Sequence, residues 1–350
     1  MKNISDIDKN FKVKTDIHKE DIRFYDVNEK PFEVYGVFYE DSKFRRLPEK
    51  IARKVNDNVL ALHANTAGGR VRFITDSEYV AIHAQLQSVG KMPHFAMTGS
   101  AGFDLYIREN SRERYSKTFV PPFEITDSYE SVVESGNRNL KEITINFPLY
   151  SEVTALYIGL SEKAKVSEAS PYTYKKPIVF YGSSITQGGC ASRPGLSYES
   201  ILSRKFDTDF INLGFSAGAR GEDEIAEYIG NLDMNVFVYD YDHNAPTAEH
   251  LKNTHERMFE IIRKAKPDLP VIIMSRPKFI LTDDEKDRLE IIKATYLHAK
   301  EKGDGNVYFI DGEELMKKAE NDGTVDDCHP NDLGFMSMAE AVGKVLEKIL

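Results

Sequence analysis

Cysteine is scarce in this sequence, with two residues, Cys190 and Cys328, among 350. A secreted protein stapled by disulfides would usually have more of them. We therefore interpret both cysteines as small, buried packing residues. Each of them nevertheless lies beside a segment that carries candidate catalytic groups.

Long apolar runs are also missing. No stretch approaches the roughly 18 apolar residues that could span a bilayer. The first 21 residues are polar and contain no apolar run of signal-peptide length. We therefore expect a cytoplasmic protein that has no membrane partner.

Basic residues are outnumbered, with 46 Lys and Arg against 56 Asp and Glu, and the formal net charge is −10. Such an acidic chain lacks the excess of positive charge that would attract nucleic acid or an anionic membrane. The substrate should therefore be small or neutral. Tryptophan is absent, which argues mildly against a dedicated polysaccharide-binding surface because sugar rings often stack on aromatic faces.

The first half of the chain has the pattern of short β-strands. Apolar and polar residues alternate over residues 32–39, 71–74, 80–86, 103–107 and 143–147, with Gly, Asn, Asp and Pro between them. This pattern predicts an all-β sandwich or jelly roll. Gly68 and Gly69 are expected to form a hairpin turn between strands at residues 59–63 and 70–74.

The second half alternates between strands and helices. Strands are expected at residues 178–181, 210–214, 236–241, 271–274 and 307–310, and helices at 198–206, 222–232, 247–265, 283–302 and 333–350. This alternation predicts an α/β domain with a doubly wound parallel sheet. We place the domain boundary near Ser170, in a polar segment, so the β-domain covers residues 1–170 and the α/β domain 171–350.

The first strand of the α/β domain ends in a turn rich in glycine and serine, Tyr181-Gly182-Ser183-Ser184-Ile185-Thr186-Gln187-Gly188. Sites in open α/β sheets form at the carboxyl ends of the strands. Gly182 can take a tight turn. Ser184 would then lie at a helix N-terminus, where backbone N–H groups face developing negative charge. This position suits a nucleophile for acyl transfer.

A second segment supplies the groups that a serine nucleophile needs, Asp326-Asp327-Cys328-His329-Pro330-Asn331-Asp332. A general base must take the serine proton, and a carboxylate must orient the base. Asp326 lies three residues before His329 and can reach its Nδ1 from the same loop; Asp327 is the rival partner. Pro330 keeps His329 outside the last helix, which Asn331 or Asp332 can cap.

These two segments resemble sequence blocks of the SGNH hydrolases, also called the GDSL family. The resemblance covers roughly residues 177–350, although Ser183 stands where the family usually has Asp. It implies a flavodoxin-like sheet and hydrolysis of acyl esters without a cofactor or a metal. Ser184 would be the nucleophile, His329 the general base and Asp326 its orienting partner.

Two more segments resemble the blocks that supply oxyanion donors in that family, residues 212–218 and 242–246. The resemblance implies an oxyanion hole made by the backbone N–H groups of Ser184 and Ala217 and the side chain of Asn244. Gly218 is the alternative to Ala217 as the second donor. Ala245 stands where the family usually has Asp after the Asn.

The N-terminal half is similar to a β-sandwich that precedes the hydrolase domain in a subset of the family. The likeness rests on Arg46-Leu47-Pro48 and on Ser100-Ala101-Gly102-Phe103-Asp104-Leu105-Tyr106. Members with this layout are similar to carbohydrate esterases that remove acetyl groups from plant-type polysaccharides or oligosaccharides.

Other residues have weaker claims to the site. His243, next to Asn244, and Arg193, in the loop after Ser184, are candidate substrate contacts. A competing interpretation is a metal-dependent phosphoesterase, whose ligands would come from Asp240, Asp242, His243, Asp326, Asp327 and His329.

The sequence therefore predicts a serine esterase that hydrolyses acyl esters, above all acetyl esters, of carbohydrates. Its partner would be a small-molecule or oligosaccharide ester. One alternative keeps the triad but acts on lipid esters or thioesters, and another is a non-catalytic sugar-binding protein. The sequence leaves open the ester position, the oligomeric state and any contribution of the β-domain to the site.

Overall fold

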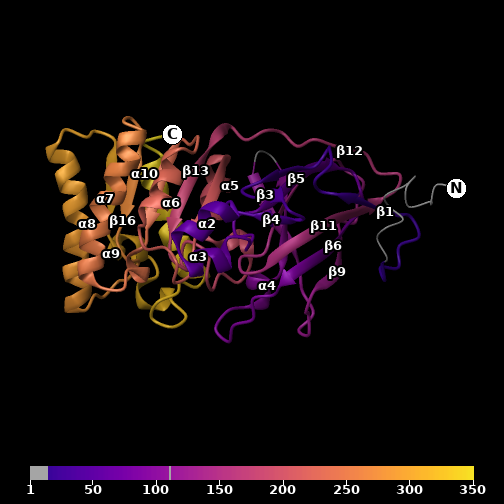
Figure 1. Cartoon of the computed structure of the whole chain (residues 1–350). Helices are drawn as coiled ribbons and strands as arrows, with labels where there is room; N and C mark the ends of the chain where they lie inside the picture. The colour runs from indigo at the N-terminus through magenta and orange to yellow at the C-terminus, as the bar shows by residue number, and fades with distance from the viewer. Residues whose placement is uncertain (1–14, 110–111) are drawn as a thin grey trace.

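The computed structural model describes residues 15–109 and 112–350, so residues 1–14, most of the polar N-terminal segment, lie outside the described residues. Two parts lie side by side, an all-β part from the first half of the chain and a layered part of helices and strands from the second (Figure 1). The prediction of a β-sandwich ahead of a doubly wound α/β domain is confirmed.

Two antiparallel sheets form the first part, with strand orders β1-β11-β6-β9 and β12-β5-β10-β7-β8; β2 pairs with β5. The first sheet has β1 (Ile22–Asp26), β11 (Glu152–Ser161), β6 (Tyr79–Ser88) and β9 (Ser128–Glu134). The second has β12 (Val166–Ser167), β5 (Arg70–Thr75), β10 (Lys141–Asn146), β7 (Phe103–Glu109), β8 (Arg112–Phe119) and β2 (Glu33–Tyr35). Inward-facing residues such as Phe73, Ile82, Ile145 and Ile158 are fully buried in one core between the sheets.

Two details of the first half contradict the sequence prediction. Residues 59–63 are not a strand, because residues 57–62 form helix α3 (Asp57–Leu62), so Gly68 and Gly69 close no hairpin with them. The side chain of Asn56 caps this helix by accepting from the Val59 N–H. The single strand predicted over residues 32–39 is divided into β2 and β3 (Phe38–Glu40) by Gly36, whose φ is 73°. β3 pairs with β4 (Lys43–Arg45).

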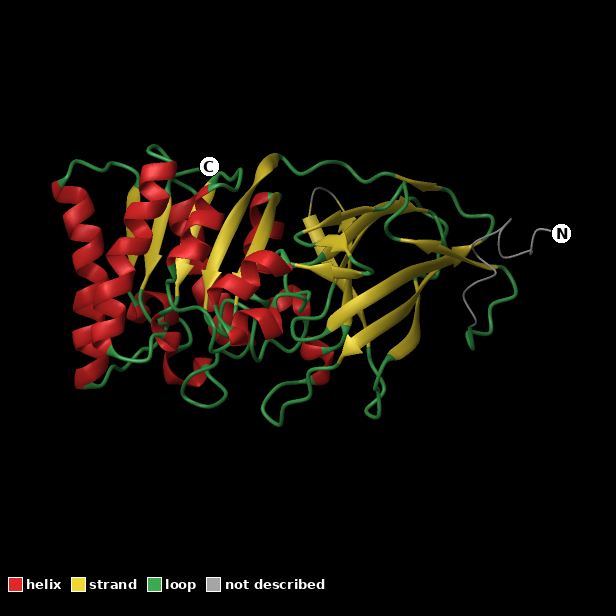
Figure 2. Ribbon diagram, viewed as in Figure 1, coloured by secondary structure: helices red, strands yellow, loops and turns green. Residues whose placement is uncertain are grey.

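The sheet of the second part is parallel, in the order β14-β13-β15-β16-β17. Its strands are β13 (Tyr174–Gly182), β14 (Thr208–Gly214), β15 (Val236–Asp240), β16 (Val271–Met274) and β17 (Val307–Ile310). Numbered within the domain, this is the 2-1-3-4-5 order of flavodoxin-like folds, as the family resemblance implied. The arrowheads in Figure 2 show that the carboxyl ends share one edge of the sheet.

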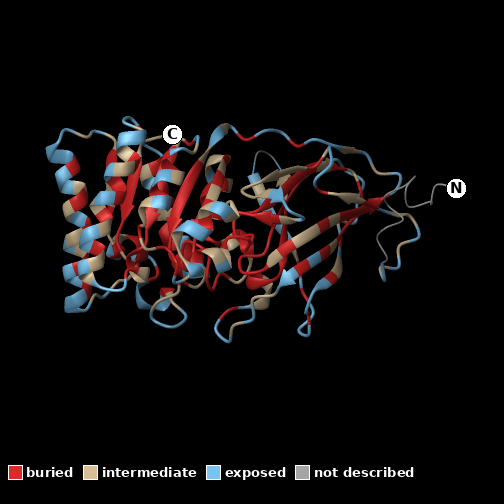
Figure 3. Cartoon of the chain, in the orientation of Figure 1, coloured by how far each residue is buried: buried red, intermediate tan, exposed pale blue. Residues whose placement is uncertain are grey.

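Helices cover both faces of this sheet. One face carries α6 (Asp223–Gly230), α7 (Ala248–Ala265) and α8 (Asp283–Glu301), and the other α5 (Tyr198–Phe206), α9 (Gly312–Met316) and α10 (Asp332–Leu346). Val179 faces the first core and Ile178 the second. Figure 3 shows the strands between these helices as buried. Among residues 15–109 and 112–350, no helix combines the length and apolar character that a membrane crossing needs.

Two short helices from the first half of the chain pack on the α/β part, α2 (Glu49–Val55) and α3. They lie at the junction of the two parts in Figure 1. Leu47, Ala52 and Val59 are fully buried in the same core as α6 and α7. The two parts therefore share a hydrophobic core as well as a linking segment.

Candidate active site

The turn after β13 is tight and needs glycine at its first position. A Cβ on Gly182 would lie 2.2 Å from the backbone oxygen of Asp240, on the neighbouring strand β15. The Ser183 N–H donates to that same oxygen at 3.1 Å, and Ser183 Oγ accepts from the Ile185 N–H. Ser183 thus fixes the turn through hydrogen bonds, and the chain then presents Ser184, which is 8% exposed, at the edge of the sheet.

Ser184 and His329, 145 residues apart, come together at this edge. Ser184 Oγ lies 2.9 Å from His329 Nε2. His329 Nδ1 lies 2.8 Å from Asp326 Oδ2, and Asp326 Oδ1 accepts from the His329 backbone N–H at 2.7 Å. Partial burial tends to raise the pKa of Asp326, but these hydrogen bonds hold it below its usual range. An ionised Asp326 favours the Nδ1–H tautomer, which leaves Nε2 free to take a proton.

The rival carboxylate, Asp327, points elsewhere. Its side chain is 80% exposed and pairs with Lys278 at 3.0 Å. The structure therefore brings Asp326, and not Asp327, to His329.

The loop that carries His329, residues 324–331, is here called the histidine loop. It folds back on itself, since the Val325 N–H donates to the His329 carbonyl. Asn331 caps α10 by accepting from the N–H groups of Leu333 and Gly334. Asp332, the first residue of α10, accepts from the N–H and the Oγ hydroxyl of Ser192, and so ties the helix that follows the histidine loop to the serine loop, residues 183–197.

The proposed oxyanion donors lie on loops that are joined to the serine loop. Gln187 accepts from the Ser216 N–H at 3.0 Å, and Asn244 Nδ2 donates to the Phe215 carbonyl at 2.8 Å. Within residues 15–109 and 112–350 the N–H groups of Ser184 and Ala217 find no hydrogen-bond partner, whereas that of Gly218 donates to Phe215. Ala217, with φ of 55°, is therefore better placed than Gly218 to offer a free N–H to a ligand.

Arg46 explains one part of the sequence resemblance in the β-domain. Its guanidinium is buried and donates to the backbone oxygens of Asn212 and Gly214 at the end of β14, and to that of Asn65. It also lies over the Phe215 ring. Burial lowers the pKa of Arg46 to about 9. Arg46 thus holds the base of the loop that carries Ala217.

Asp104 and Tyr106 explain the second part of the sequence resemblance in the β-domain, residues 100–106. Asp104, fully buried, accepts from Arg193 Nη1 and from the Gly195 N–H, both at 2.9 Å. The Tyr106 hydroxyl bonds to the same guanidinium, which stacks on Tyr115. These contacts hold the serine loop against the β-domain. They give Arg193 a role between domains, and its predicted contact with substrate stays a prediction.

The β-domain also reaches Ser184 and His329 themselves, which sequence reasoning did not foresee. The Tyr150 hydroxyl donates to the Ser184 carbonyl at 3.1 Å. The His94 ring, from the loop between β6 and α4 (Met97–Ser100), lies 5.4 Å from the His329 ring, centroid to centroid. Cys190, whose φ is 76°, lies near both His94 and His329, and burial raises the pKa of its thiol to about 12. No local pattern marks His94 or Tyr150, because both depend on long-range contacts.

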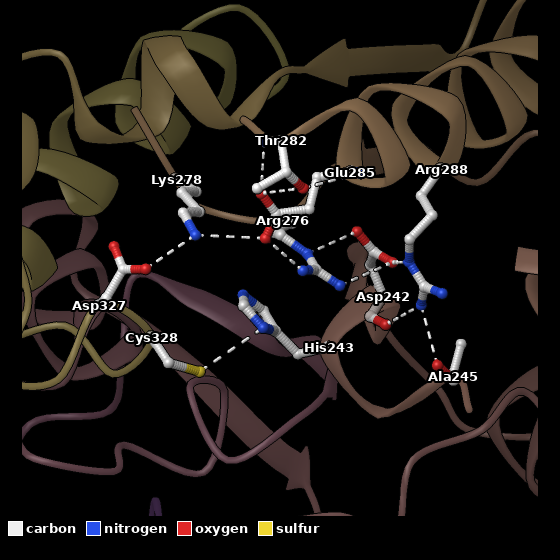
Figure 4. Close-up of polar contacts among 10 residues, drawn as sticks. All are labelled: Asp242, His243, Ala245, Arg276, Lys278, Thr282, Glu285, Arg288, Asp327 and Cys328. Atoms are coloured by element: carbon white, nitrogen blue, oxygen red, sulfur yellow. Dashed lines mark hydrogen bonds and ion pairs between the residues drawn. The ribbon is translucent and has the colours of Figure 1, made fainter. Parts of the chain in front are cut away.

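A network of charges lies beside the histidine loop (Figure 4). Asp242, buried, pairs with Arg276 and Arg288, and Arg276 pairs in turn with Glu285. Glu285 also pairs with Lys278, which reaches Asp327. The network therefore joins the loop of Asn244 to that of His329 within the α/β domain.

His243 lies against this network. Its Nδ1 is 3.6 Å from Cys328 Sγ, and burial lowers its pKa to about 3, so the ring is neutral. Its predicted contact with substrate stays a prediction.

The competing metal interpretation finds no support in the described residues. Asp242 is occupied by two arginines, and Asp327 by Lys278. Within the described part of the chain, the one group of His, Cys, Asp and Glu with mutually close ligand atoms is a different set, His94, Cys190 and His329.

Comparisons with known proteins agree with this architecture. Residues 175–347 match the sequence model of the GDSL-like lipase/acylhydrolase family, and residues 22–166 match a family described as the N-terminus of SGNH-hydrolase-type esterases. A comparison with curated proteins gave no match.

Solved structures resemble the whole chain. A Bacteroides ovatus protein described as a GDSL-like lipase is 28% identical, with a TM-score of 0.84 over 94% of this chain and 98% of its own. A salicylyl-acyltransferase from a tetracycline biosynthetic pathway is 18% identical, with a TM-score of 0.76 over 95% and 98%. A family two carbohydrate esterase from Clostridium thermocellum, in complex with cellohexaose, is 13% identical, with a TM-score of 0.61 over 91% and 98%. The last two likenesses concern the fold alone.

Proposed function

We propose that Ser184, His329 and Asp326 are the catalytic triad of a carboxylic ester hydrolase, a chain whose two parts match the models of the N-terminus of SGNH-hydrolase-type esterases and of the GDSL-like lipase/acylhydrolase family. One observation carries the proposal. Two hydrogen bonds, of 2.9 and 2.8 Å, run from Ser184 Oγ through the two ring nitrogens of His329 to Asp326. Nucleophile, base and orienting carboxylate stand in the order that acyl transfer needs.

The reaction follows from these positions. Ser184 Oγ attacks the ester carbonyl carbon while His329 Nε2 takes the serine proton. The N–H groups of Ser184 and Ala217, with the Asn244 amide, stabilise the oxyanion. His329 then returns the proton to the leaving alcohol oxygen, and an acyl-serine remains. Water, deprotonated by His329, releases the acid and restores Ser184. This chemistry needs no cofactor.

We further propose that the ester is an acetyl ester of a sugar or oligosaccharide. The two-domain layout resembles that of deacetylating carbohydrate esterases, and a family two carbohydrate esterase shares the fold. The side chains of His329 and Asp326 are 22% and 37% exposed, so the site opens at a rim that a bulky leaving group can approach. A small acyl group on a large alcohol suits such a rim better than a long acyl chain, which needs an apolar groove.

The first test is Ser184→Ala, with hydrolysis of p-nitrophenyl acetate as the readout. We expect turnover to fall by roughly a thousandfold or more, because the loss of a triad nucleophile removes the covalent route. Ser183→Ala is the matched control, since it removes the neighbouring hydroxyl; it should cost less than about tenfold. Turnover near the wild-type value in Ser184→Ala would refute the triad.

The second test separates substrates by acyl length and by alcohol. We expect acetate release from acetylated oligosaccharides, and a kcat/KM that falls from acetyl to octanoyl p-nitrophenyl esters. A clear rise toward octanoyl would favour a lipid ester or thioester instead. Tight binding of an acetylated oligosaccharide with no release of acetate would identify a sugar-binding protein.

A further inference from the structure

Three potential metal ligands from distant parts of the chain meet beside Ser184. His94 comes from the β-domain, Cys190 from the serine loop and His329 from the histidine loop. One ligand atom of each lies within 4.8 Å of the other two. Within residues 15–109 and 112–350 this is the one such convergence of His, Cys, Asp and Glu side chains.

The donor set and its spacing suit one class of ion. Two imidazoles and a thiolate are ligands that zinc and other thiophilic divalent cations prefer, whereas magnesium and calcium prefer oxygen. Zinc with bonds of about 2.0–2.3 Å keeps its nitrogen and sulfur ligands roughly 3.3–3.6 Å apart. The three ligand atoms therefore have to move about 1 Å closer together when the ion binds.

The hydrogen bonds around His329 also suit a metal. A histidine that binds zinc usually donates its other ring N–H to a carboxylate, which fixes the tautomer and raises the basicity of the ligand. His329 Nδ1 already faces Asp326 at 2.8 Å, so Nε2 is the nitrogen left to bind an ion. The arrangement that makes His329 a general base thus also makes it a metal ligand.

We propose that His94, Cys190 and His329 form an inhibitory site for a thiophilic divalent cation of the zinc class. Binding joins the cation to Nε2 of His329 and to Sγ of Cys190, whose proton leaves to the solvent. Ser184 Oγ then loses its proton acceptor, which lies 2.9 Å away in the free enzyme. The inhibition rests on the proposed function, because it requires His329 to be the general base; the binding does not.

The test of inhibition titrates the full-length enzyme with zinc chloride in a buffer that does not chelate it, with p-nitrophenyl acetate as substrate. We expect inhibition at micromolar zinc that EDTA reverses, and none by magnesium at the same concentration. Each variant is compared with its own uninhibited rate. His94→Ala and Cys190→Ser should each raise the half-inhibitory concentration by at least about tenfold, because loss of even an outer-shell partner costs that much affinity.

Cys328→Ser is the matched control, because Cys328 is the second thiol near the site and lies 3.6 Å from His243. It should leave the half-inhibitory concentration unchanged. The proposal is overturned if zinc does not inhibit, or if His94→Ala and Cys190→Ser are inhibited like the wild type. A shift in Cys328→Ser alone would also overturn it, since the ion would then sit on Cys328 and His243.

A second readout does not depend on turnover. Cobalt(II), a spectroscopic substitute for zinc, is added to the Ser184→Ala protein, and the thiolate-to-cobalt charge-transfer absorption is recorded. We expect the band in this protein and in a Ser184→Ala/Cys328→Ser double variant, but not with Cys190→Ser. Absence of the band overturns the site. A band without zinc inhibition of the wild type overturns the inhibitory role, whereas the triad is tested separately, by the loss of turnover in Ser184→Ala.

Discussion

The serine loop and the histidine loop meet at the hydrogen bond between Ser184 and His329, yet opposite kinds of contact hold them. The serine loop is held by the β-domain through Asp104, which is fully buried. The histidine loop is held within its own domain through Asp327, whose side chain is 80% exposed. Buried ionic contacts are costly to break and exposed ones contribute little. The serine loop is thus held by a buried ionic contact, whereas one of the contacts of the histidine loop is an exposed ion pair that salt can weaken.

The largest loss of stability should come from a change at Asp104, the buried carboxylate that holds the serine loop. Asp104→Asn removes the negative charge that pairs with the Arg193 cation and puts an amide N–H2 in place of one of the two oxygens that accept from Arg193, Gly195 and Asn146 in a fully buried place. We expect the free energy of unfolding to fall by about 3 kcal/mol or more, because an uncompensated buried charge remains. Denaturant unfolding measures it, and kcat should fall too because the serine loop shifts.

Asp127→Asn provides the control, since Asp127 is an exposed carboxylate of the same domain. It should change stability by less than about 0.5 kcal/mol. If Asp104→Asn behaved like this control, the serine loop would not depend on the β-domain and the comparison would fail.

An intermediate effect is expected from Glu285. It belongs to the same charge network as the exposed Asp327, but its own side chain is 10% exposed. Burial alone would raise the pKa of Glu285, but hydrogen bonds from Thr282, Arg276 and Lys278 lower it to about 2. Its carboxylate therefore stabilises the fold above the unfolded-state pKa of about 4.5, and this stability is lost as pH falls toward about 2. Glu285→Gln should cost up to about 3 kcal/mol at neutral pH.

Urea unfolding at several pH values measures this effect. The difference between wild type and Glu285→Gln should shrink below pH 4.5. Glu290→Gln, at an exposed position of α8, should follow the wild-type curve at every pH. A Glu285→Gln difference that stayed constant down to pH 2 would mean that the ionised carboxylate is not the source of the stability.

The smallest loss of stability should come from the ion pair between Lys278 and the exposed Asp327 of the histidine loop. Lys278→Met removes the ion pair with Asp327, at 3.0 Å, and the weaker contact with Glu285. We expect less than about 1 kcal/mol of lost stability, because Asp327 is 80% exposed, so that its ion pair is screened by water, and Glu285 keeps Arg276 as a partner. Turnover should fall a few-fold at low salt and approach that of the wild type at high salt. A loss as large as that of Asp104→Asn would show that both loops are held alike.

Most of the α/β domain could be predicted because its signals are local. Helix α5 lies at residues 198–206, as expected, because Ser197 caps it and its apolar residues recur at helical spacing. The contact between Asp326 and His329 could also be predicted, because the two residues lie three positions apart in the same loop. The catalytic roles of these residues stay predictions until the variants are measured.

The β-domain shows where such reasoning fails. Residues 59–63 alternate like a strand, but the cap at Asn56 and burial of Val59 against the α/β core favour a helix. The segment around Asp104 was noticed as a family feature, but its partner Arg193 is 89 residues away. Tyr150 and His94 likewise reach the site across the domain junction. Spacing along the chain says nothing about contacts of this range.

Arg46 has a consequence for how such a protein can evolve. Its buried guanidinium completes the hydrogen bonding of carbonyl groups on a strand of the other domain. A gene fusion that joined this α/β domain to a foreign β-domain would leave the carbonyls of Asn212 and Gly214 without this donor, and Arg46 would keep only its acceptors within the first half of the chain, the carbonyls of Leu62 and Asn65. We therefore expect the two halves to be inherited as one unit, and new specificities to arise by change in the loops at their junction rather than by exchange of whole domains.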